Sequence, residues 1–156
     1  MAGLEDLYRE IILDHYRSPR NRGELAAPPA HRSEGFNPLC GDEIVVFLDV
    51  ENSLVRDVKI GGQGCSISQS SASMMSAAVK GKTIDEARRL VRAFKAMMSI
   101  HEHVLDGDEI PEPDPDVKLG DLEALRGVVK FPVRINCATL SWNTLTQGLD
   151  EAEATA

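Results

Sequence analysis

Three cysteines and one aspartate carry the chemistry that this sequence suggests. Cys40 and Asp42 stand two residues apart, and Gly41 between them lets the backbone turn sharply. Cys65 and Cys137 follow further along the chain. Thiolate sulfurs with one carboxylate oxygen suit tetrahedral zinc, and three thiolates around one ion also suit iron. One interpretation is a shared metal site. The other is that Cys65 and Cys137 are merely small buried hydrophobic residues.

The elements around these residues decide which of them can meet. Residues 43–50 and 54–60 are rich in β-branched side chains, and the turn signal at 51–53 between them predicts a hairpin. The antiparallel return of this hairpin brings Cys65, at the far end of its second strand, back beside Cys40. Cys137 lies near the start of the last predicted helix, and spacing alone does not bring it to the others.

Four segments with helical spacing of apolar residues predict helices, at residues 4–16, 66–80, 84–98 and 134–149. Thr83 and Glu86 form a capping-box pattern at the start of the third helix. Strands come early and helices late in this order. We therefore predict an α+β fold, in which a small antiparallel sheet of about three strands carries helices on one face.

Side chains of the second hairpin strand alternate in a pattern that predicts one solvent-exposed face. We expect the core side to consist of Leu54, Val58 and Ile60. We expect the solvent side to consist of Val55, Asp57 and Lys59. The glycine-rich run at 61–64 is expected to end the strand before the next helix begins.

The negative charge of the chain is concentrated in one segment. The 156 residues carry a net charge of −8, and the stretch between residues 99 and 117 has seven acidic residues without Lys or Arg. Prolines at positions 111, 113 and 115 favour an extended loop there. We predict one domain over residues 1–149 with this acidic loop inserted at 99–117, followed by a frayed acidic tail at 150–156.

Charge and hydropathy exclude several classes of partner. An acidic chain argues against nucleic acid or an anionic membrane, because phosphate groups need a basic surface. The longest apolar stretch, at 44–48, is far shorter than the roughly 20 residues of a membrane span. The first residues lack the features of a secretion signal, so we expect a cytoplasmic protein with reduced thiols. His15 and His31 have no partner pattern and are expected at the surface or as capping residues.

Five short motifs resemble those of the SufU/IscU family of iron–sulfur cluster assembly proteins. They are N-P-L-C-G-D at 37–42, G-Q-G-C-S-I-S at 62–68, S-A-S-M-M at 71–75, G-K-T at 81–83 and K-F-P-V-R-I-N-C-A-T-L at 130–140. The IscU branch places a His directly before its third Cys, whereas this sequence has Asn136 there. That position and the extra residues between Cys65 and Cys137 are similar to the SufU branch.

The resemblance implies a zinc-dependent sulfurtransferase that acts as co-substrate and activator of a cysteine desulfurase. It implies that zinc is held by Cys40, Asp42, Cys65 and Cys137, and that Cys40 accepts the sulfur. Arg134 matches an Arg of the family motif and is expected to offset thiolate charge. The implied partners are a PLP-dependent, SufS-like desulfurase and a downstream iron–sulfur scaffold.

Two other functions remain open at this point. The same ligands could build a [2Fe–2S] cluster as a scaffold, although Asn136 removes a nitrogen ligand. A purely structural zinc domain is the third possibility. The expected position of Cys40 on a flexible, glycine-flanked loop argues against it. The acidic loop, with His101 and His103, has no role that the sequence assigns.

Overall fold

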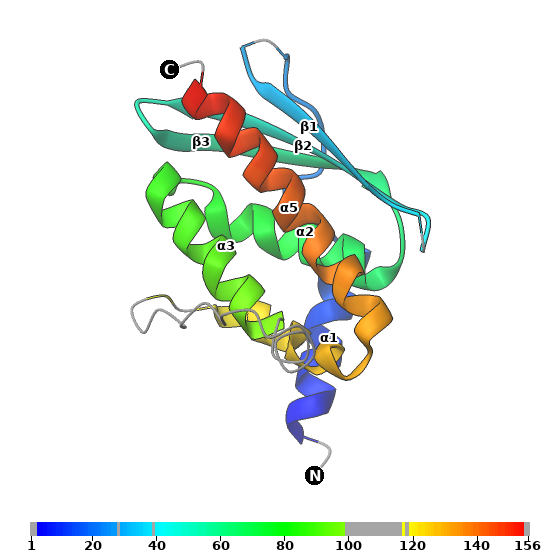
Figure 1. Ribbon diagram of the computed structural model, residues 1–156. Coiled ribbons are helices and arrows are strands. Elements are labelled where there is room, and N and C mark those ends of the chain that lie inside the picture. Colours follow the sequence, from blue (N-terminus) through cyan, green and yellow to red (C-terminus); the bar gives the residue numbers. More distant parts are fainter. Residues whose placement is uncertain (1–2, 28, 39, 99–116, 118, 155–156) are drawn as a thin grey trace, which may run out of the picture.

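The computed structural model describes residues 3–27, 29–38, 40–98, 117 and 119–154. Eight elements follow one another along the chain (Figure 1), and we keep the labels of that figure. They are α1 (Gly3–Arg17), β1 (His31–Asn37), β2 (Asp42–Glu51), β3 (Leu54–Gln63), α2 (Ser66–Val79), α3 (Ile84–Met98), the 3₁₀ helix η1 (Gly120–Lys130) and α5 (Pro132–Ala154). The predicted acidic loop lies outside the described residues except for Val117. The α+β class predicted from the sequence is confirmed.

The three strands form one antiparallel sheet in the order β1-β2-β3. Helix α5 packs against β1 and β2, and α2 packs between α5 and β3, so both lie on the same face of the sheet (Figure 1). A Cβ at Gly35 would collide with Thr144, so this glycine lets α5 approach β1 closely. The close packing positions the first turns of α5 near the turn between β1 and β2.

The predicted hairpin is confirmed, but the assignment of faces in its second strand is partly wrong. A bulge between Asp49 and Val50 changes the register, so that Val50 pairs with Val55. Val55 and Val58 are therefore both fully buried, and Leu54 at the strand start is 38% exposed. An extra residue in one strand shifts every side chain beyond it to the other face. The strand also continues to Gln63 instead of ending at the glycine run.

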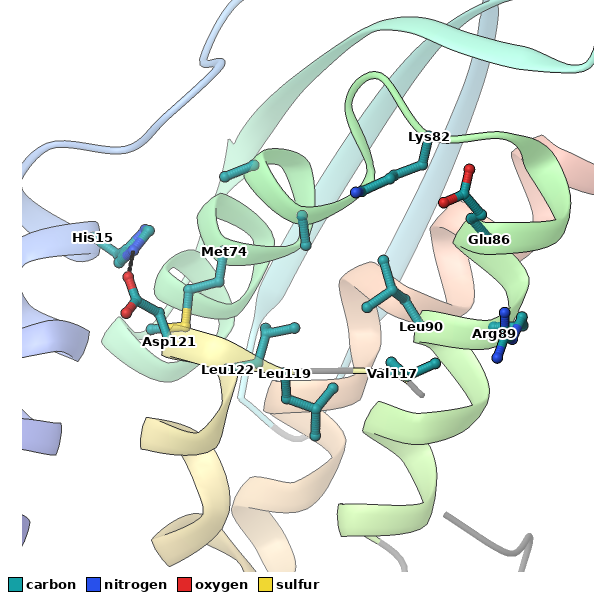
Figure 2. Close-up of a pocket in the computed structure, with 12 residues that line it drawn as sticks. His15, Met74, Lys82, Glu86, Arg89, Leu90, Val117, Leu119, Asp121 and Leu122 are labelled. Carbon is teal, nitrogen blue, oxygen red and sulfur yellow. Dashed lines mark ion pairs between the residues drawn. The ribbon is translucent and has the colours of Figure 1, made fainter. Parts of the chain in front are cut away.

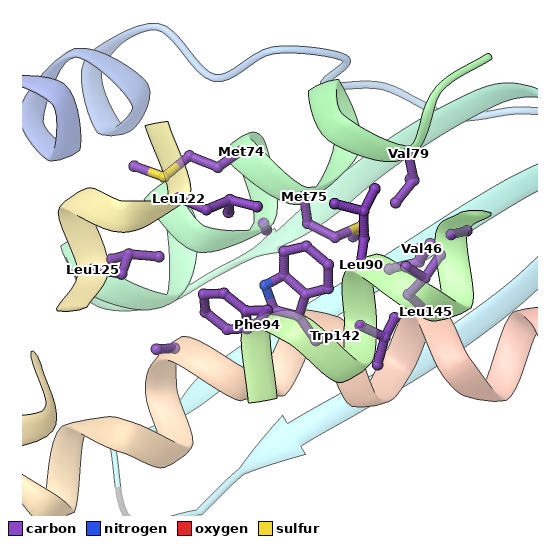
Figure 3. Close-up of a cluster of buried hydrophobic side chains, with 14 of the residues drawn as sticks. Val46, Met74, Met75, Val79, Leu90, Phe94, Leu122, Leu125, Trp142 and Leu145 are labelled. Carbon is purple, nitrogen blue, oxygen red and sulfur yellow. The ribbon is translucent and has the colours of Figure 1, made fainter. Parts of the chain in front are cut away.

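The core lies between the sheet and the helices (Figure 3). Trp142 of α5 stacks on Phe94 of α3 with ring centroids 4.5 Å apart. The indole N–H of Trp142 donates to the Ser71 hydroxyl at 3.1 Å, and that hydroxyl donates to the Ala138 carbonyl at 2.6 Å. These bonds tie the start of α5 to α2, because a buried polar group needs a partner.

Local sequence signals explain where α3 begins and why α5 extends further than expected. The Glu86 amide donates to the Thr83 hydroxyl, and the Thr83 amide donates to the Glu86 carboxylate, so the predicted capping box is confirmed. Helix α5 does not fray at residue 150 as we expected but continues to Ala154. Arg88 of α3 pairs there with Asp150 at 2.8 Å and with Glu153 at 3.0 Å.

Among the described helices, none is long and apolar enough to cross a membrane.

Candidate metal centre

Three separate segments bring the predicted residues to one end of the sheet. Cys40 and Asp42 lie at the turn between β1 and β2, which the Gly41 amide closes by donating to the Asn37 carbonyl at 2.9 Å. Gly41 has a φ of 69°, a conformation that favours glycine. Cys65 is the N-cap residue of α2. Cys137 is fully buried near the start of α5.

Cys40, Asp42 and Cys137 form one cluster. One ligand atom from each of them lies within 4.8 Å of the others, and the Sγ atoms of Cys40 and Cys137 are 3.1 Å apart. Ligands of a tetrahedral zinc ion are roughly 3.5 Å from one another, given Zn–S and Zn–O distances near 2.3 and 2.1 Å. The spacing of this cluster therefore suits a single ion. The packing of α5 on β1 brings Cys137 to Cys40 and Asp42, a contact that spacing along the sequence does not predict.

Cys65 touches the cluster through Asp42. Its Sγ lies 4.0 Å from one Asp42 carboxylate oxygen, and its backbone N–H donates to the other at 2.9 Å. The Cys65 sulfur also accepts the backbone N–H of Ser68 at 3.5 Å, which caps α2. The hairpin return predicted from the sequence thus brings Cys65 back beside the turn that carries Cys40.

Asp42 is fully buried and ionised. Burial alone would raise its pKa, but hydrogen bonds from the Cys65 amide and from the Cys137, Ser68 and Cys65 side chains outweigh it and lower the pKa below the usual range. In the described part of the chain, the Asp42 carboxylate is contacted by amide, hydroxyl and thiol groups. A buried carboxylate among cysteines is a donor that suits a cation.

Cys137 is a thiol and not a thiolate in this arrangement. Burial raises its pKa far above the usual range, and its hydrogen bonds to Cys40 and Asp42 and the nearby negative charge raise it further. Without a cation, the cluster therefore keeps a proton on its most buried sulfur. A positive ion is the group that would convert this thiol into a ligand.

Arg134 lies one helical turn before Cys137 and is exposed. A hydrogen bond with Cys137 is the main cause that raises the pKa of its guanidinium, and electrostatic interactions with Cys65, Cys137 and Cys40 act in the same direction. The Arg134 side chain thus interacts with all three cysteines. That it offsets thiolate charge stays a prediction.

Two residues that shape the site, Asn37 and Gly64, had no role assigned from the sequence. Asn37 donates through its amide to an Asp42 carboxylate oxygen at 3.4 Å and to the Cys137 sulfur at 3.6 Å. Gly64 leaves room for the carboxylate, since a Cβ there would lie 2.5 Å from an Asp42 oxygen and 2.6 Å from the Ser68 hydroxyl. Asn37 lies in the N-P-L-C-G-D motif and Gly64 in the G-Q-G-C-S-I-S motif. Their closeness in sequence to Cys40 and Cys65 was therefore the signal that could have identified them as site residues.

A separate cavity of about 500 Å³ lies between α1, α2, α3 and the start of η1 (Figure 2). None of the three cysteines lines it. At one end, His15 lies 3.6 Å from Asp121 and 2.8 Å from the Ser73 hydroxyl. His15 is only 5% exposed, so the expectation of a surface or capping histidine is wrong for this residue. Through these two contacts, the His15 side chain links α1 to α2 and to η1.

The fold and the site define a small α+β protein with a cluster of cysteines and one aspartate, at one end of its sheet, that could hold a metal ion. Residues 7–138 match the family model of the NifU-like N-terminal domain. The chain belongs to the family of NifU-like N-terminal domains, and the resemblance stated from its motifs is confirmed.

Curated relatives cover nearly the whole chain. It is 44% identical to the zinc-dependent sulfurtransferase SufU of Bacillus subtilis (strain 168) over 152 residues, 97% of this chain and 95% of the relative. It is 36% identical to the iron–sulfur cluster assembly scaffold protein IscU of Streptococcus pyogenes serotype M1 over 149 residues, 96% of this chain and 86% of the relative.

A solved structure has the same fold. The crystal structure of an iron–sulfur cluster assembly scaffold protein for the SUF system, from Fervidobacterium islandicum AW-1, superposes with a TM-score of 0.78. That protein is 32% identical in sequence, and the match covers 94% of this chain and 99% of the other.

Proposed function

We propose that this protein is a zinc-bound sulfur carrier, which accepts persulfide sulfur from a cysteine desulfurase and passes it on for iron–sulfur cluster assembly. The observation that carries the proposal is the cluster of Cys40, Asp42 and Cys137, with Cys65 in contact with Asp42. The identity to a zinc-dependent sulfurtransferase over 97% of the chain supports it.

Cys40, Asp42, Cys65 and Cys137 would hold the ion. Three thiol groups and one ionised, buried carboxylate are the donors that zinc takes in tetrahedral protein sites. A bound zinc ion supplies positive charge that lowers the pKa of its cysteine ligands, and it has no redox chemistry of its own. Cys65 is the N-cap residue of α2 and Cys137 lies near the start of α5, so helices anchor both, and the Ser68 amide already donates to the Cys65 sulfur.

We assign sulfur acceptance to Cys40, which lies on the glycine turn and is half-buried. Its thiolate attacks the outer sulfur of the partner's cysteine persulfide. A sulfur–sulfur bond forms on Cys40, the sulfur–sulfur bond of the partner breaks, and the partner's cysteine leaves as a thiolate. No oxidant or reductant is consumed. Arg134 stabilises the negative charge on sulfur during this exchange.

The partners that fit this chemistry are a PLP-dependent, SufS-like desulfurase and a downstream iron–sulfur scaffold, both in the cytoplasm. In this scheme the protein is a co-substrate of the desulfurase and activates it by removing its persulfide. Asn136, directly before Cys137, is exposed and offers no imidazole to a cluster. This position favours the carrier over a protein that itself assembles a [2Fe–2S] cluster.

Metal analysis of protein purified without added metal tests the proposal. We expect close to one zinc per chain, with X-ray absorption showing three sulfur neighbours and one oxygen neighbour. A Cys137→Ser variant should retain much less zinc, whereas a variant of the exposed Ser53 in the distal hairpin turn, Ser53→Ala, should keep the parental content. Iron–sulfide scattering in the parent would instead support the scaffold, and metal far below one per chain would contradict both.

A further inference from the structure

Two sulfur atoms of the cysteine cluster lie within reacting distance of each other. Sγ of Cys40 is 3.1 Å from Sγ of Cys137, and the Cys137 thiol is the donor of a hydrogen bond to it. Atoms held roughly 3–3.5 Å apart react readily, because the fold has already removed the entropy cost of bringing them together. When Cys40 carries a transferred sulfur, its own Sγ becomes the inner sulfur of a persulfide. Cys137 then lies next to that inner sulfur.

Cys137 is better placed than Cys65 to react with Cys40. The cluster of ligand atoms within 4.8 Å of one another includes Cys40 and Cys137 but not Cys65. The Cys65 sulfur instead accepts the Ser68 amide at 3.5 Å and lies 4.0 Å from an Asp42 oxygen. Cys137 is fully buried, whereas Cys40 is half-buried. A small anion formed at Cys40 therefore has a route to solvent, and the Cys137 sulfur is shielded from thiols in solution.

We propose that Cys137 resolves the Cys40 persulfide when the site holds no zinc, so that the chain releases the carried sulfur as sulfide. The inference rests on the proposed function, which puts the sulfur on Cys40. The Cys137 sulfur bonds to Sγ of Cys40, the sulfur–sulfur bond of the persulfide breaks, and the outer sulfur leaves as hydrosulfide with the Cys137 proton. Two electrons pass from the two cysteine sulfurs to the outer sulfur. The products are a Cys40–Cys137 disulfide and hydrosulfide, and no other oxidant or reductant takes part.

Cys137 cannot resolve the persulfide and hold zinc at the same time. As a metal ligand its sulfur has lost the proton that the leaving sulfur needs, and its electron pair is engaged. The zinc-loaded protein therefore keeps the sulfur for the next protein, and the zinc-free protein discards it. The disulfide also takes Cys40 and Cys137 out of the set of ligands. The chain can bind zinc again only after a thiol reductant has opened this bond.

The first experiment removes zinc from the sulfur-loaded protein. Zinc-loaded protein accepts sulfur from the desulfurase and cysteine, is separated from both, and is treated with a chelator in the absence of thiols. We expect close to one hydrosulfide for each Cys40 persulfide, and mass spectra with a disulfide peptide that joins Cys40 to Cys137. Without the chelator, release should be at least tenfold slower. The rate after chelation should not depend on protein concentration, because the reaction takes place within one chain.

Variants test the role of Cys137 directly. Metal-free chains are loaded with an inorganic polysulfide, so that the measurement depends neither on zinc binding nor on the desulfurase. Cys137→Ser should keep its persulfide, with release at least tenfold slower than in the parent. Val133→Ala, a change of an exposed residue in the first turn of α5, should release sulfide at the parental rate. Thermal unfolding is measured for each variant. If Cys137→Ser is unfolded, the disulfide peptide of the parent decides alone.

A Cys40 persulfide that survives chelation in the parent would overturn the inference while leaving the proposed function intact. A disulfide that joins Cys40 to Cys65, or release from folded Cys137→Ser at the parental rate, would overturn it as well. Failure of the desulfurase to load Cys40 would instead contradict the proposed function. The polysulfide-loaded parent would then still show whether Cys137 releases the sulfur.

Discussion

At the residue scale, the candidate metal centre depends on how Asp42 is held. Its carboxylate is fully buried, one oxygen accepts the Cys65 amide at 2.9 Å, and the other lies 3.4 Å from the Asn37 side-chain amide. These contacts fix the only oxygen donor of the cluster before any ion arrives. A site whose ligands are preorganised binds its metal without first having to order them.

Gly64 gives a prediction at this scale. In Gly64→Ala, the new Cβ would lie 2.5 Å from an Asp42 oxygen and would displace the carboxylate. We expect zinc affinity to fall at least tenfold and the free energy of unfolding to drop by about 1–3 kcal/mol, as for other overpacked sites. Chelator competition and urea unfolding measure the two effects.

The matched control for this variant is Gly61→Ala, three residues earlier in β3. A Cβ at Gly61 would make only an ordinary contact, 4.0 Å from the Val45 side chain. Zinc affinity and stability should therefore stay close to those of the parent. If Gly64→Ala behaved in the same way as Gly61→Ala, Asp42 would not need its observed position to bind zinc.

At the element scale, the buried His15 joins α1 to the rest of the fold. The Ser73 hydroxyl accepts the Arg20 amide at 2.8 Å, so its own proton can go to Nδ1 of His15. Burial lowers the pKa of His15, and the charge of Arg20 lowers it further against the opposing effect of Asp121. The imidazole is thus neutral when α1 is docked.

This contact predicts acid sensitivity. The pKa of His15 is lower in the folded protein than in the unfolded chain, where it is about 6.5, so the unfolded chain takes up the proton first. The contribution of His15 to stability is complete above pH 6.5 and is lost as the pH falls below it. The loss can reach about 1.4 kcal/mol per pH unit over the range where only the unfolded chain is protonated.

Urea unfolding from pH 7.5 to pH 5.5 in the presence of a chelator checks this prediction without interference from metal binding. His15→Asn keeps an acceptor near the Ser73 hydroxyl but does not titrate. It should be less stable than the parent at pH 7.5 and should lose less stability on acidification. Equal slopes for the parent and His15→Asn would show that His15 is not the responsible group.

The elements differ in how well the sequence predicts them, for physical reasons. The hairpin of β2 and β3 has β-branched runs on either side of a turn signal, and α3 has strong periodicity and a capping box, so the sequence predicts both. The stretch that forms β1, at 31–37, has few β-branched residues, and it becomes a strand because it pairs along β2. Helix η1 was missed, although Leu122, Leu125 and Val128 recur at the three-residue spacing of a 3₁₀ helix.

At the scale of the whole molecule, the candidate metal centre forms because segments that are distant in the sequence meet. Local spacing predicts that Cys40, Asp42 and Cys65 approach one another, since one hairpin carries all three. Cys137 joins them only because α5 packs on β1, where Gly35 admits Thr144. Such a contact has no signature in spacing along the chain. Only the resemblance of the motifs anticipated it.

If Cys40 is the sulfur acceptor, as we propose, the transferred sulfur must be found on this residue. Zinc-loaded protein is incubated with the desulfurase and cysteine, its remaining thiols are alkylated, and peptides are analysed by mass spectrometry. We expect one added sulfur atom on the peptide that contains Cys40, and no transfer to a folded Cys40→Ser variant. Sulfur found on Cys65 or Cys137 instead, or equal transfer to Cys40→Ser, would contradict it.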